Sequence, residues 1–377
     1  MNETQPPKRI PLFDGTLQSE LAGAIRAAIE RVIASQRFIL GEEVSAFERE
    51  MAEWLGVPHA VGLSSGSDAL LVALLALGIG PGDEVITTPF SFFASTEAIL
   101  RAGARPVFAD IEPRTFNLNP AQVERVLSPK TRAILPVHLF GRAADMNELR
   151  ALAARARVAL VEDAAQAIGA SVGGLRVGAL GTVGCFSFFP SKNLGAFGDG
   201  GLLTTHDAAL AETSRSLRSH GFSPKHHSRL LGGNFRLDAL QAAVLRAKLP
   251  YLEAWNANRQ RIAERYRELL SPLAERAAER LSLPERAGAE HVFNQFVVRS
   301  SERAALEGHL RSAGVETARY YPVPIHLQDT CKSLGYRRGD FPHAERACEE
   351  ALGLPMFAEL SDEQLEYVVS ALGAFFT

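Results

Sequence analysis

Cysteine is scarce in this sequence of 377 residues, and no charge predominates. The three cysteines, Cys185, Cys331 and Cys348, include no C-x-x-C pair. Their odd number argues against a disulfide framework, and their spacing argues against a cysteine zinc site. The 40 Lys and Arg residues nearly balance the 43 Asp and Glu residues, which leaves a net charge of -3. This balance gives no reason to expect nucleic acid or an acidic membrane surface as a partner.

Long apolar runs are also missing. The longest one, residues 69–77, is far shorter than the roughly 20 residues that a membrane-spanning helix needs. The N-terminal segment carries prolines and no apolar stretch, so it does not resemble a secretory signal peptide. With 46% hydrophobic and 22% charged residues, the composition is typical of a soluble enzyme. We expect a cytoplasmic protein with no membrane partner.

Strand-like and helix-like segments alternate through the first two-thirds of the chain. Short apolar segments predict strands over residues 59–62, 84–88, 105–109, 132–137 and 158–161. Amphipathic segments between them predict helices over residues 68–77, 92–101, 120–127 and 145–154. This alternation predicts an α/β fold with a mostly parallel central sheet flanked by helices. Ligands bind at the carboxyl ends of such strands, so functional residues are expected just after them.

The pattern changes in the last third of the chain. A helical stretch runs from Leu237 to about Leu270, and Pro250 predicts a bend or break within it. One strand, a helix, an Arg/Tyr/Pro-rich segment (319–326) and terminal helices follow. We therefore predict a large domain over residues 1–245, which includes an N-terminal helical segment. A smaller C-terminal α+β domain is predicted over residues 246–377.

Asp163 and Lys192 are the first candidates for chemistry. Asp163 ends a buried strand, although it could also cap a short helix over residues 164–168. Lys192 lies in an apolar, aromatic loop flanked by glycine. Burial lowers the pKa of an amine, and such a lysine is a nucleophile able to form a Schiff base. The alternative for Lys192 is a surface lysine on a flexible turn.

Together these two residues match the requirements of pyridoxal 5'-phosphate. A lysine holds that cofactor as a Schiff base, and a carboxylate keeps its pyridine nitrogen protonated. Residues 64–67 (SSGS) open a helix, so their N–H groups can hold a phosphate, to which Ser187 can add a hydroxyl. Phe92–Phe93 can place an aromatic ring on the cofactor, and Gln166 can reach its phenolic oxygen.

Two competing kinds of site have weaker support. The glycines of residues 78–82 (GIGPG) follow a helix and lack the G-x-G-x-x-G spacing of a dinucleotide site, so we interpret them as a helix end. The histidines at positions 206, 220, 226 and 227 lack the spacing of metal ligands. We expect no metal site.

Six ordered strings of the sequence resemble a known family. They are GSDAL (66–70), GPGDEVI (80–86), PVHLFG (136–141), EDAAQ (162–166), FSFFPSKNLG (186–195) and GNFRLDALQAA (233–243). Over nearly its whole length the chain resembles the DegT-type nucleotide-sugar aminotransferases. This resemblance implies the type I fold of pyridoxal-phosphate enzymes, which aspartate aminotransferase exemplifies.

The resemblance implies roles for individual residues. Lys192 would form the Schiff base and later act as acid and base, while Asp163 would pair with the pyridine nitrogen. The remaining cofactor residues would be Gly66, Ser67 and Ser187 at the phosphate, Phe93 stacked on the ring, and Gln166 at the phenolic oxygen. Asn234 would reach the phosphate of a neighbouring subunit, which implies a homodimer with shared active sites. Asn234 could equally be a turn residue.

Members of this family take an amino group from L-glutamate and deliver it to the keto group of a nucleotide-linked ketosugar. The segment 319–327 resembles the one that lines the sugar pocket, and packing at the domain interface is its alternative role. The resulting candidates for substrate binding are Arg236, Tyr321 and His326, although Arg236 could be a structural arginine. Two departures are visible. Ser67 stands where Thr is common, and Phe92 stands where Thr commonly precedes the stacking aromatic, which puts a contact there in doubt.

A dehydratase branch of the family carries histidine in place of the Schiff-base lysine. Because Lys192 is present, the sequence favours a ping-pong transamination. Three alternatives stay open: a pyridoxal-phosphate-dependent nucleotide-sugar dehydratase, a non-catalytic regulator that binds the cofactor, and a plain nucleotide-sugar binding protein. The sequence does not identify the sugar, its nucleotide or the ring carbon that is aminated.

Overall fold

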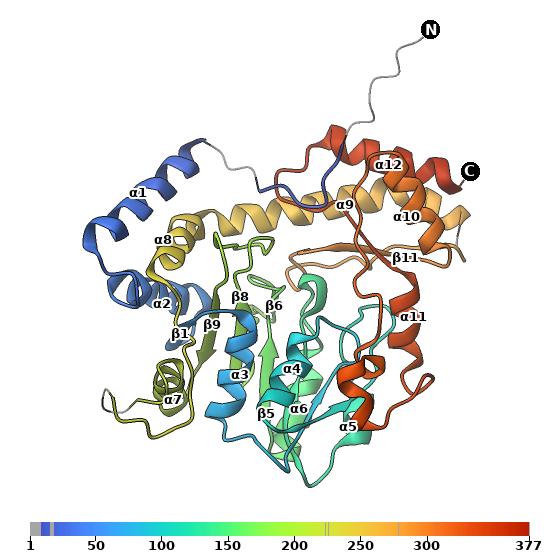
Figure 1. Cartoon of the computed structure of the whole chain (residues 1–377). Helices are drawn as coiled ribbons and strands as arrows, with labels where there is room; N and C mark the ends of the chain where they lie inside the picture. The colour runs from blue at the N-terminus through green and yellow to red at the C-terminus, as the bar shows by residue number, and fades with distance from the viewer. Residues whose placement is uncertain (1–8, 16–18, 223, 225, 278, 377) are drawn as a thin grey trace.

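The structure is a computed structural model that describes residues 9–15, 19–222, 224, 226–277 and 279–376. Figure 1 shows one sheet in the N-terminal two-thirds of the chain, with helices on both of its sides. The C-terminal helices gather beyond the edge of the sheet where its parallel strands end. A long helix joins the two parts.

The central sheet has seven strands within the described residues. They are β1 (His59–Leu63), β2 (Glu84–Thr87), β3 (Arg105–Phe108), β4 (Thr131–Leu135), β5 (Ala159–Asp163), β8 (Val183–Ser187) and β9 (Gly201–Thr205). Their order across the sheet is β1-β9-β8-β5-β4-β2-β3. The strands from β3 to β8 in this order are parallel, while β9 is antiparallel to both β8 and β1. The predicted α/β fold with a mostly parallel sheet is confirmed.

Helices cover both faces of the sheet. One face packs against α3 (Gly66–Ala76), α4 (Ala94–Arg101) and α7 (Ala208–Arg218). The other face packs against α2 (Glu42–Leu55), α5 (Pro120–Val126), α6 (Met146–Ala156) and α8 (Ala239–Lys248). The first helix, α1 (Ser19–Ser35), lies on α8. Parallel strands buried on both faces require such covering helices.

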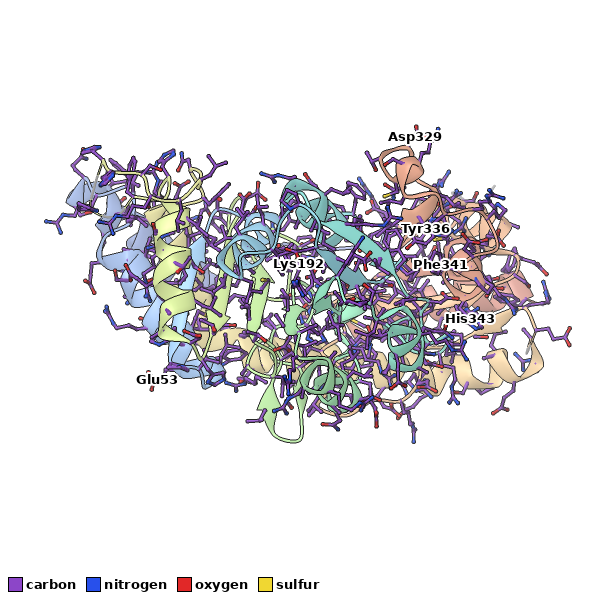
Figure 2. The ribbon with its side chains drawn as sticks, turned by 90° about the horizontal axis from the view of Figure 1, so that it is seen from below. Glu53, Lys192, Asp329, Tyr336, Phe341 and His343 are labelled. Carbon is purple, nitrogen blue, oxygen red and sulfur yellow. The ribbon has the colours of Figure 1, made fainter. Side chains whose placement is uncertain are left out.

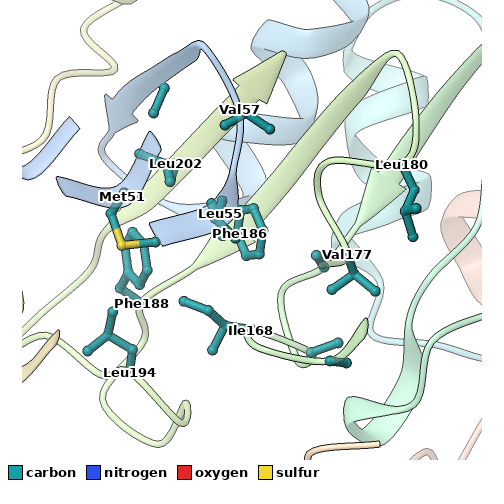
Figure 3. Close-up of a cluster of buried hydrophobic side chains, with 14 of the residues drawn as sticks. Met51, Leu55, Val57, Ile168, Val177, Leu180, Phe186, Phe188, Leu194 and Leu202 are labelled. Atoms are coloured by element: carbon teal, nitrogen blue, oxygen red, sulfur yellow. The ribbon is translucent and has the colours of Figure 1, made fainter. Parts of the chain in front are cut away.

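Side-chain alternation along β8 sorts its residues between the two faces. Phe186 and, just beyond the strand, Phe188 are fully buried against residues such as Met51 and Leu202 on the α2 side (Figure 3). Burying each aromatic side chain contributes about 1.5–3 kcal/mol to folding. Because successive side chains of a strand point to opposite faces, Ser187 points to the α3 side. The same alternation in β5 places Asp163 on that side, together with buried Val161.

The segment after β5 differs from the sequence-based expectation. Residues 164–168 form turns rather than the short helix considered as an alternative. Asp163 is the last residue of β5, opposite Cys185 of β8. The N–H group of Ala164 donates to the Cys185 carbonyl at 2.8 Å. The backbone therefore continues the sheet ladder at the point where a helix would have started.

The C-terminal part has its own small sheet. A 3-10 turn, Leu249–Tyr251, contains Pro250 and separates α8 from α9 (Leu252–Arg276), so the predicted break is confirmed. Three antiparallel strands follow: β10 (Leu281–Ser282), β11 (Phe296–Ser300) and β12 (Ala351–Leu354). The helices around them are α10 (Arg303–Ser312), α11 (Pro342–Glu350) and α12 (Asp362–Phe376). The predicted domain boundary at residues 245/246 falls inside α8 and stays a prediction.

Short elements complete the fold. A two-stranded hairpin, β6 (Ser171–Val172) and β7 (Leu175–Arg176), follows β5, and 3-10 turns cover Leu139–Gly141, Ile325–Leu327 and Asp329–Leu334. Among the helices of the described residues, none combines the length and the hydropathy that crossing a membrane requires.

Candidate active site

The candidate residues meet at the carboxyl ends of the parallel strands, where sheets of this type bind ligands. Asp163 ends β5, Ser187 ends β8, and the first turn of α3 begins at Gly66. The loop after β8 carries Lys192, which lies near the middle of the molecule when it is viewed from below (Figure 2). Strands that are distant in sequence thus deliver their last residues to one place.

Asp163 is buried, with 4% of its surface exposed, and its carboxylate is held by two donors. The Ser95 hydroxyl on α4 donates to Oδ2 at 2.7 Å, and the backbone N–H of Ala165 donates to Oδ1 at 3.1 Å. Burial raises the pKa of Asp163 above its ordinary value, while these two hydrogen bonds and the charge of Lys192 oppose the rise. The carboxylate is therefore fixed in orientation and can accept a further donor.

Lys192 lies in a tightly closed loop. Its backbone N–H donates to the Phe189 carbonyl at 2.8 Å. A Cβ on Gly195 would lie 2.3 Å from the carbonyl oxygen of Pro190, so only glycine allows this close approach. Burial lowers the pKa of Lys192 to about 8, and Asp163 partly opposes that shift. The fraction of neutral amine near neutral pH is thus far larger than for an ordinary lysine, although the protonated form still predominates, and this neutral fraction is available as a nucleophile or base.

Gln166 connects the two parts of the chain at the site. Its Oε1 accepts the backbone N–H of Phe140 at 2.6 Å, which fixes the orientation of the amide. Its Nε2 donates to the Tyr321 hydroxyl at 2.9 Å. An amide nitrogen carries two hydrogens, so one donor stays available for an oxygen in the site. Tyr321 therefore lies beside Gln166, and its predicted contact with the substrate stays a prediction.

The start of α3 offers a cradle for a phosphate. Ser65 caps the helix by accepting the N–H of Asp68, and no hydrogen bond of the described residues uses the N–H groups of Gly66 and Ser67. A Cβ on Gly66 would lie 2.6 Å from the Cβ of Ser187, so glycine alone lets the helix end approach β8. Helix N-termini attract anions. Together with the Lys192 amine and the buried carboxylate, the residues present fit a pyridoxal phosphate group.

The two neighbouring aromatic rings that follow β2, Phe92 and Phe93, differ in exposure. Phe92 is 60% exposed, and its ring centroid lies 6.3 Å from that of Tyr321. Phe93 is partly buried and packs against a cluster that includes Phe90 and Ile325. Because Phe93 is only partly buried, its packing on this cluster is compatible with stacking on a cofactor through the rest of its ring. The stacking role of Phe93 therefore stays a prediction, and the exposed Phe92 is a second candidate for it.

A pair of alanine variants separates the two candidates. Phe93→Ala is expected to weaken cofactor binding by about 3- to 10-fold, because aromatic stacking contributes about 0.5–1.5 kcal/mol. Phe92→Ala, at the exposed ring, is expected to leave cofactor affinity and the thermal unfolding midpoint nearly unchanged. Cofactor affinity can be measured by titrating the apoprotein with pyridoxal phosphate, and unfolding by calorimetry. Weaker binding in Phe92→Ala alone would assign the stacking role to Phe92.

Asn234 and Arg236 form a separate group. The Arg236 Nε donates to the Asn234 Oδ1 at 2.8 Å on an exposed surface, in a segment that pairs with the end of β1. Within the described residues, no hydrogen bond or ion pair joins either side chain to Asp163 or Lys192. Their predicted roles toward a neighbouring subunit and toward a substrate stay predictions.

The prediction that His326 binds substrate needs correction. Its side chain is buried, and its Nε2 lies 3.1 Å from the Glu345 Oε1. Its ring packs on Phe341 at a centroid distance of 4.8 Å, and Figure 2 shows Phe341 toward the C-terminal end of the molecule, away from Lys192. Glu345 also accepts backbone N–H groups of Gly339 and Phe341. His326 therefore holds the entry to α11 and is removed from the site.

Sequence reasoning missed Ser95 and Phe140. Ser95 lies on the first turn of α4, and it reaches Asp163 across 68 positions of the chain. Phe140 contributes only its backbone N–H group, in a residue with a φ of 60°. A hydroxyl in the helix turn that follows β2 was a signal for Ser95. No side-chain signal could have revealed a backbone donor.

Comparisons with known proteins agree with this geometry. The model of the DegT/DnrJ/EryC1/StrS aminotransferase family matches residues 20–373. A "Pleiotropic regulatory protein" of Geobacillus stearothermophilus is 47% identical over 369 residues, which cover 97% of this chain and 98% of that protein. The UDP-N-acetyl-3-dehydro-alpha-D-glucosamine 3-aminotransferase of Acidithiobacillus ferrooxidans is 45% identical over 366 residues, which cover 96% and 97%.

The fold of this chain is also similar to that of a protein with a solved structure. The crystal structure of DesV from S. venezuelae, in complex with a ketimine intermediate, superposes with a TM-score of 0.94 at 42% sequence identity. The match covers 98% of each chain. The similarity therefore extends over both the central sheet and the C-terminal part.

Proposed function

Because this chain belongs to the DegT/DnrJ/EryC1/StrS aminotransferase family, we propose that it transfers an amino group from L-glutamate to the keto group of a nucleotide-linked ketosugar. The observation that carries the proposal is the partly buried Lys192 amine in the loop after β8, which lies close enough to the buried Asp163 carboxylate at the end of β5 for each charge to affect the pKa of the other. The named activity of the A. ferrooxidans relative supports a sugar with its ketone at C3.

Pyridoxal 5'-phosphate, the proposed cofactor, supplies a carbonyl that condenses with amines and a ring that accepts electron density. The N–H groups of Gly66 and Ser67, with the Ser187 hydroxyl, would bind its phosphate. Asp163 would hold a proton on the ring nitrogen, in the orientation that Ser95 fixes. Gln166 would donate its remaining Nε2 hydrogen to the phenolic oxygen.

Lys192 carries the proton transfers in this proposal. Its Nζ would take the proton from the Cα of glutamate, and with the second substrate it would return a proton to the sugar carbon that receives nitrogen. The pKa of about 8 suits both directions, because a group that gives and takes protons works best near the operating pH. Phe92 and Tyr321 would limit the access of water to this centre.

Isotope transfer tests the proposed function. Purified holoprotein is incubated with amino-¹⁵N L-glutamate and a UDP- or dTDP-linked 3-ketosugar. We expect one labelled nitrogen in the sugar and one 2-oxoglutarate for each turnover, both measured by mass spectrometry. A sugar product that has lost water and contains no nitrogen would support the dehydratase alternative instead.

We also propose a homodimer whose subunits share their active sites. Exposed apolar side chains support it, since Phe38, Ile39, Phe189 and Leu231 are between 39% and 93% exposed. The exposed position of Asn234, away from its own Asp163, is consistent with a role at a neighbouring site. Monomeric proteins rarely expose extended apolar surface.

Subunit mixing tests the shared sites. Lys192→Ala and Asn234→Ala homodimers are each expected to show strongly reduced activity, because each lacks part of every site. A hybrid of the two contains one site with both residues intact, so co-refolded mixtures are expected to regain up to about half of the wild-type activity per hybrid dimer. The regain is measured after separating hybrids by orthogonal affinity tags. Hybrids no more active than their parents would contradict shared sites.

A regulatory role without turnover is the second candidate, because the G. stearothermophilus relative carries a regulatory name. The glutamate half-reaction separates the two functions. A catalyst converts the bound cofactor to its amine form on addition of glutamate alone, and the visible absorption is lost. A non-catalytic binder keeps its absorption unchanged.

A further inference from the structure

A cavity of about 330 Å³ lies beside the loop that carries Lys192. Its wall includes Lys192 itself, Lys248 from the end of α8 and Arg259 from α9. The aromatic residues Phe13, Phe197 and Trp255 line it as well, together with the carboxylates Asp14 and Glu359. Ligand pockets usually measure about 300–1,000 Å³, so this one suits an amino acid rather than a whole nucleotide sugar.

Lys248 has a buried ammonium group, and only one hydrogen bond from it is described. It is 8% exposed, and its Nζ donates to the Gly195 carbonyl at 2.5 Å. The same Nζ lies 5.4 Å from the ring centroid of Phe197 and 6.0 Å from that of Trp255. Since an ammonium group has three N–H donors, two are left for a ligand. Burial lowers the pKa of Lys248 to about 8, while Glu359 opposes that shift.

Arg259 supplies a second positive charge, and hydrogen bonds to backbone carbonyls fix its guanidinium group in place. It is 3% exposed, and its Nη1 donates to the backbone carbonyls of Phe293, Asn294 and Met356. Its Nε has no hydrogen-bond partner in the described residues. Burial lowers the pKa of Arg259 to about 10, so the guanidinium stays charged near neutral pH.

Glu359 offsets part of these positive charges, since its carboxylate acts on both Lys248 and Arg259. Glu359 is exposed to solvent, which screens its charge, whereas both cations are buried. Burial of part of its surface raises the pKa of Glu359, and the nearby Asp14 adds to that rise. The wall of the cavity nonetheless carries three cations, Lys192, Lys248 and Arg259, against two carboxylates. An anionic ligand that enters it would be attracted to Lys248.

We propose that this cavity is the subsite for the side-chain carboxylate of the amino donor, with Lys248 as its direct partner and Arg259 as a fixed charge behind it. The proposal rests on the proposed aminotransferase function, because the occupant must present its amino group to Lys192. A dicarboxylic amino acid has both groups within one short chain. The subsite therefore selects L-glutamate over donors with a neutral side chain.

Binding of an unreactive dicarboxylate measures the subsite without turnover. The chain contains two tryptophans, Trp54 and Trp255. In a Trp54→Phe holoprotein, Trp255 alone reports on the cavity by fluorescence. Glutarate is expected to change this signal with saturation, and Lys248→Met is expected to weaken its binding by about 10- to 100-fold, since a hydrogen bond to a charged group contributes about 1.5–3 kcal/mol. Lys248→Arg keeps charge and donors and is expected to retain most of the affinity.

The donor half-reaction supplies the second readout. In Lys248→Met the KM for L-glutamate is expected to rise by about 10- to 100-fold, while the half-reaction with L-alanine and the binding of UDP or dTDP stay unchanged. Lys332→Met, at an exposed lysine, is the matched control and is expected to match the wild type in every assay. Glutarate affinity and glutamate KM both unchanged in Lys248→Met would overturn the proposal.

Two further outcomes would also overturn it. Equal losses with glutamate and alanine would show that Lys248 only holds the Lys192 loop through Gly195. Weaker binding of UDP or dTDP, with glutarate unaffected, would show that the cavity takes phosphates. A wild type that binds glutarate through Lys248 but transfers no nitrogen would leave the subsite intact and refute the proposed function alone.

Discussion

Lys192→Ala is expected to lower the rate of amino transfer by about 10³- to 10⁴-fold or more, because general acid–base catalysis alone contributes 10²- to 10⁴-fold. The variant lacks the only buried amine beside Asp163 among the described residues, and with it both the nucleophile and the proton carrier of the proposed reaction. The measurement is turnover with glutamate and ketosugar. Borohydride reduction followed by peptide mapping identifies the labelled lysine.

The control for this variant is Lys130→Ala, at an exposed lysine outside the site. It is expected to keep wild-type turnover and to show reductive labelling at Lys192. Near-normal turnover in Lys192→Ala, or labelling of a different lysine in the wild type, would show that the central assignment is wrong. Circular dichroism establishes that both variants are folded.

Asp163→Asn is expected to reduce turnover by about 10²- to 10³-fold, which is the usual effect of removing a preorganised electrostatic partner of the reacting centre. The substitution keeps the size of the side chain and can still accept a hydrogen bond from Ser95. It removes the negative charge that would hold a proton on the ring nitrogen. Cofactor affinity should fall in parallel, and it can be measured by equilibrium titration of the apoprotein.

Ser95→Ala separates the effect of the negative charge of Asp163 from the effect of the orientation of its carboxylate. It leaves the carboxylate charged but removes the donor at 2.7 Å, so its effect should be smaller than that of Asp163→Asn. Asp199 is exposed and lies in the loop between Lys192 and β9, so Asp199→Asn controls for the loss of one negative charge. If Asp163→Asn retains full activity and affinity, Asp163 has no role at the ring nitrogen.

Much of the fold could be predicted because its signals are local. The strands β1 to β5 and the helices between them follow the apolar periodicity to within a few residues, and Pro250 breaks the long helical stretch where expected. The turns at residues 164–168 could not be predicted in the same way. The N–H group of Ala164, the first of these residues, donates to Cys185 of β8, which is distant along the chain, and a local pattern does not report that pairing.

Part of the candidate site could be predicted from the sequence, and the rest depends on tertiary packing. Asp163, Gln166, Ser187 and Lys192 follow their strands closely, so the sequence placed them together through the topology of a parallel sheet. The exposure of Phe92 and the partial burial of Phe93 follow from packing rather than from residue type. His326 has the residue type of a catalytic group, and only its burial against Glu345 and Phe341 removes it from the site.

By itself the sequence determined the class of fold and the residue types at the strand ends, because periodicity and order along the chain are enough for these. Tertiary structure alone decided which groups orient them. Ser95 meets Asp163 across 68 positions, and Gln166 meets Tyr321 across 155. The cavity that joins Lys248 to the Lys192 loop is also a product of packing. Such contacts depend on how distant segments close around a core, and no local pattern encodes that closure.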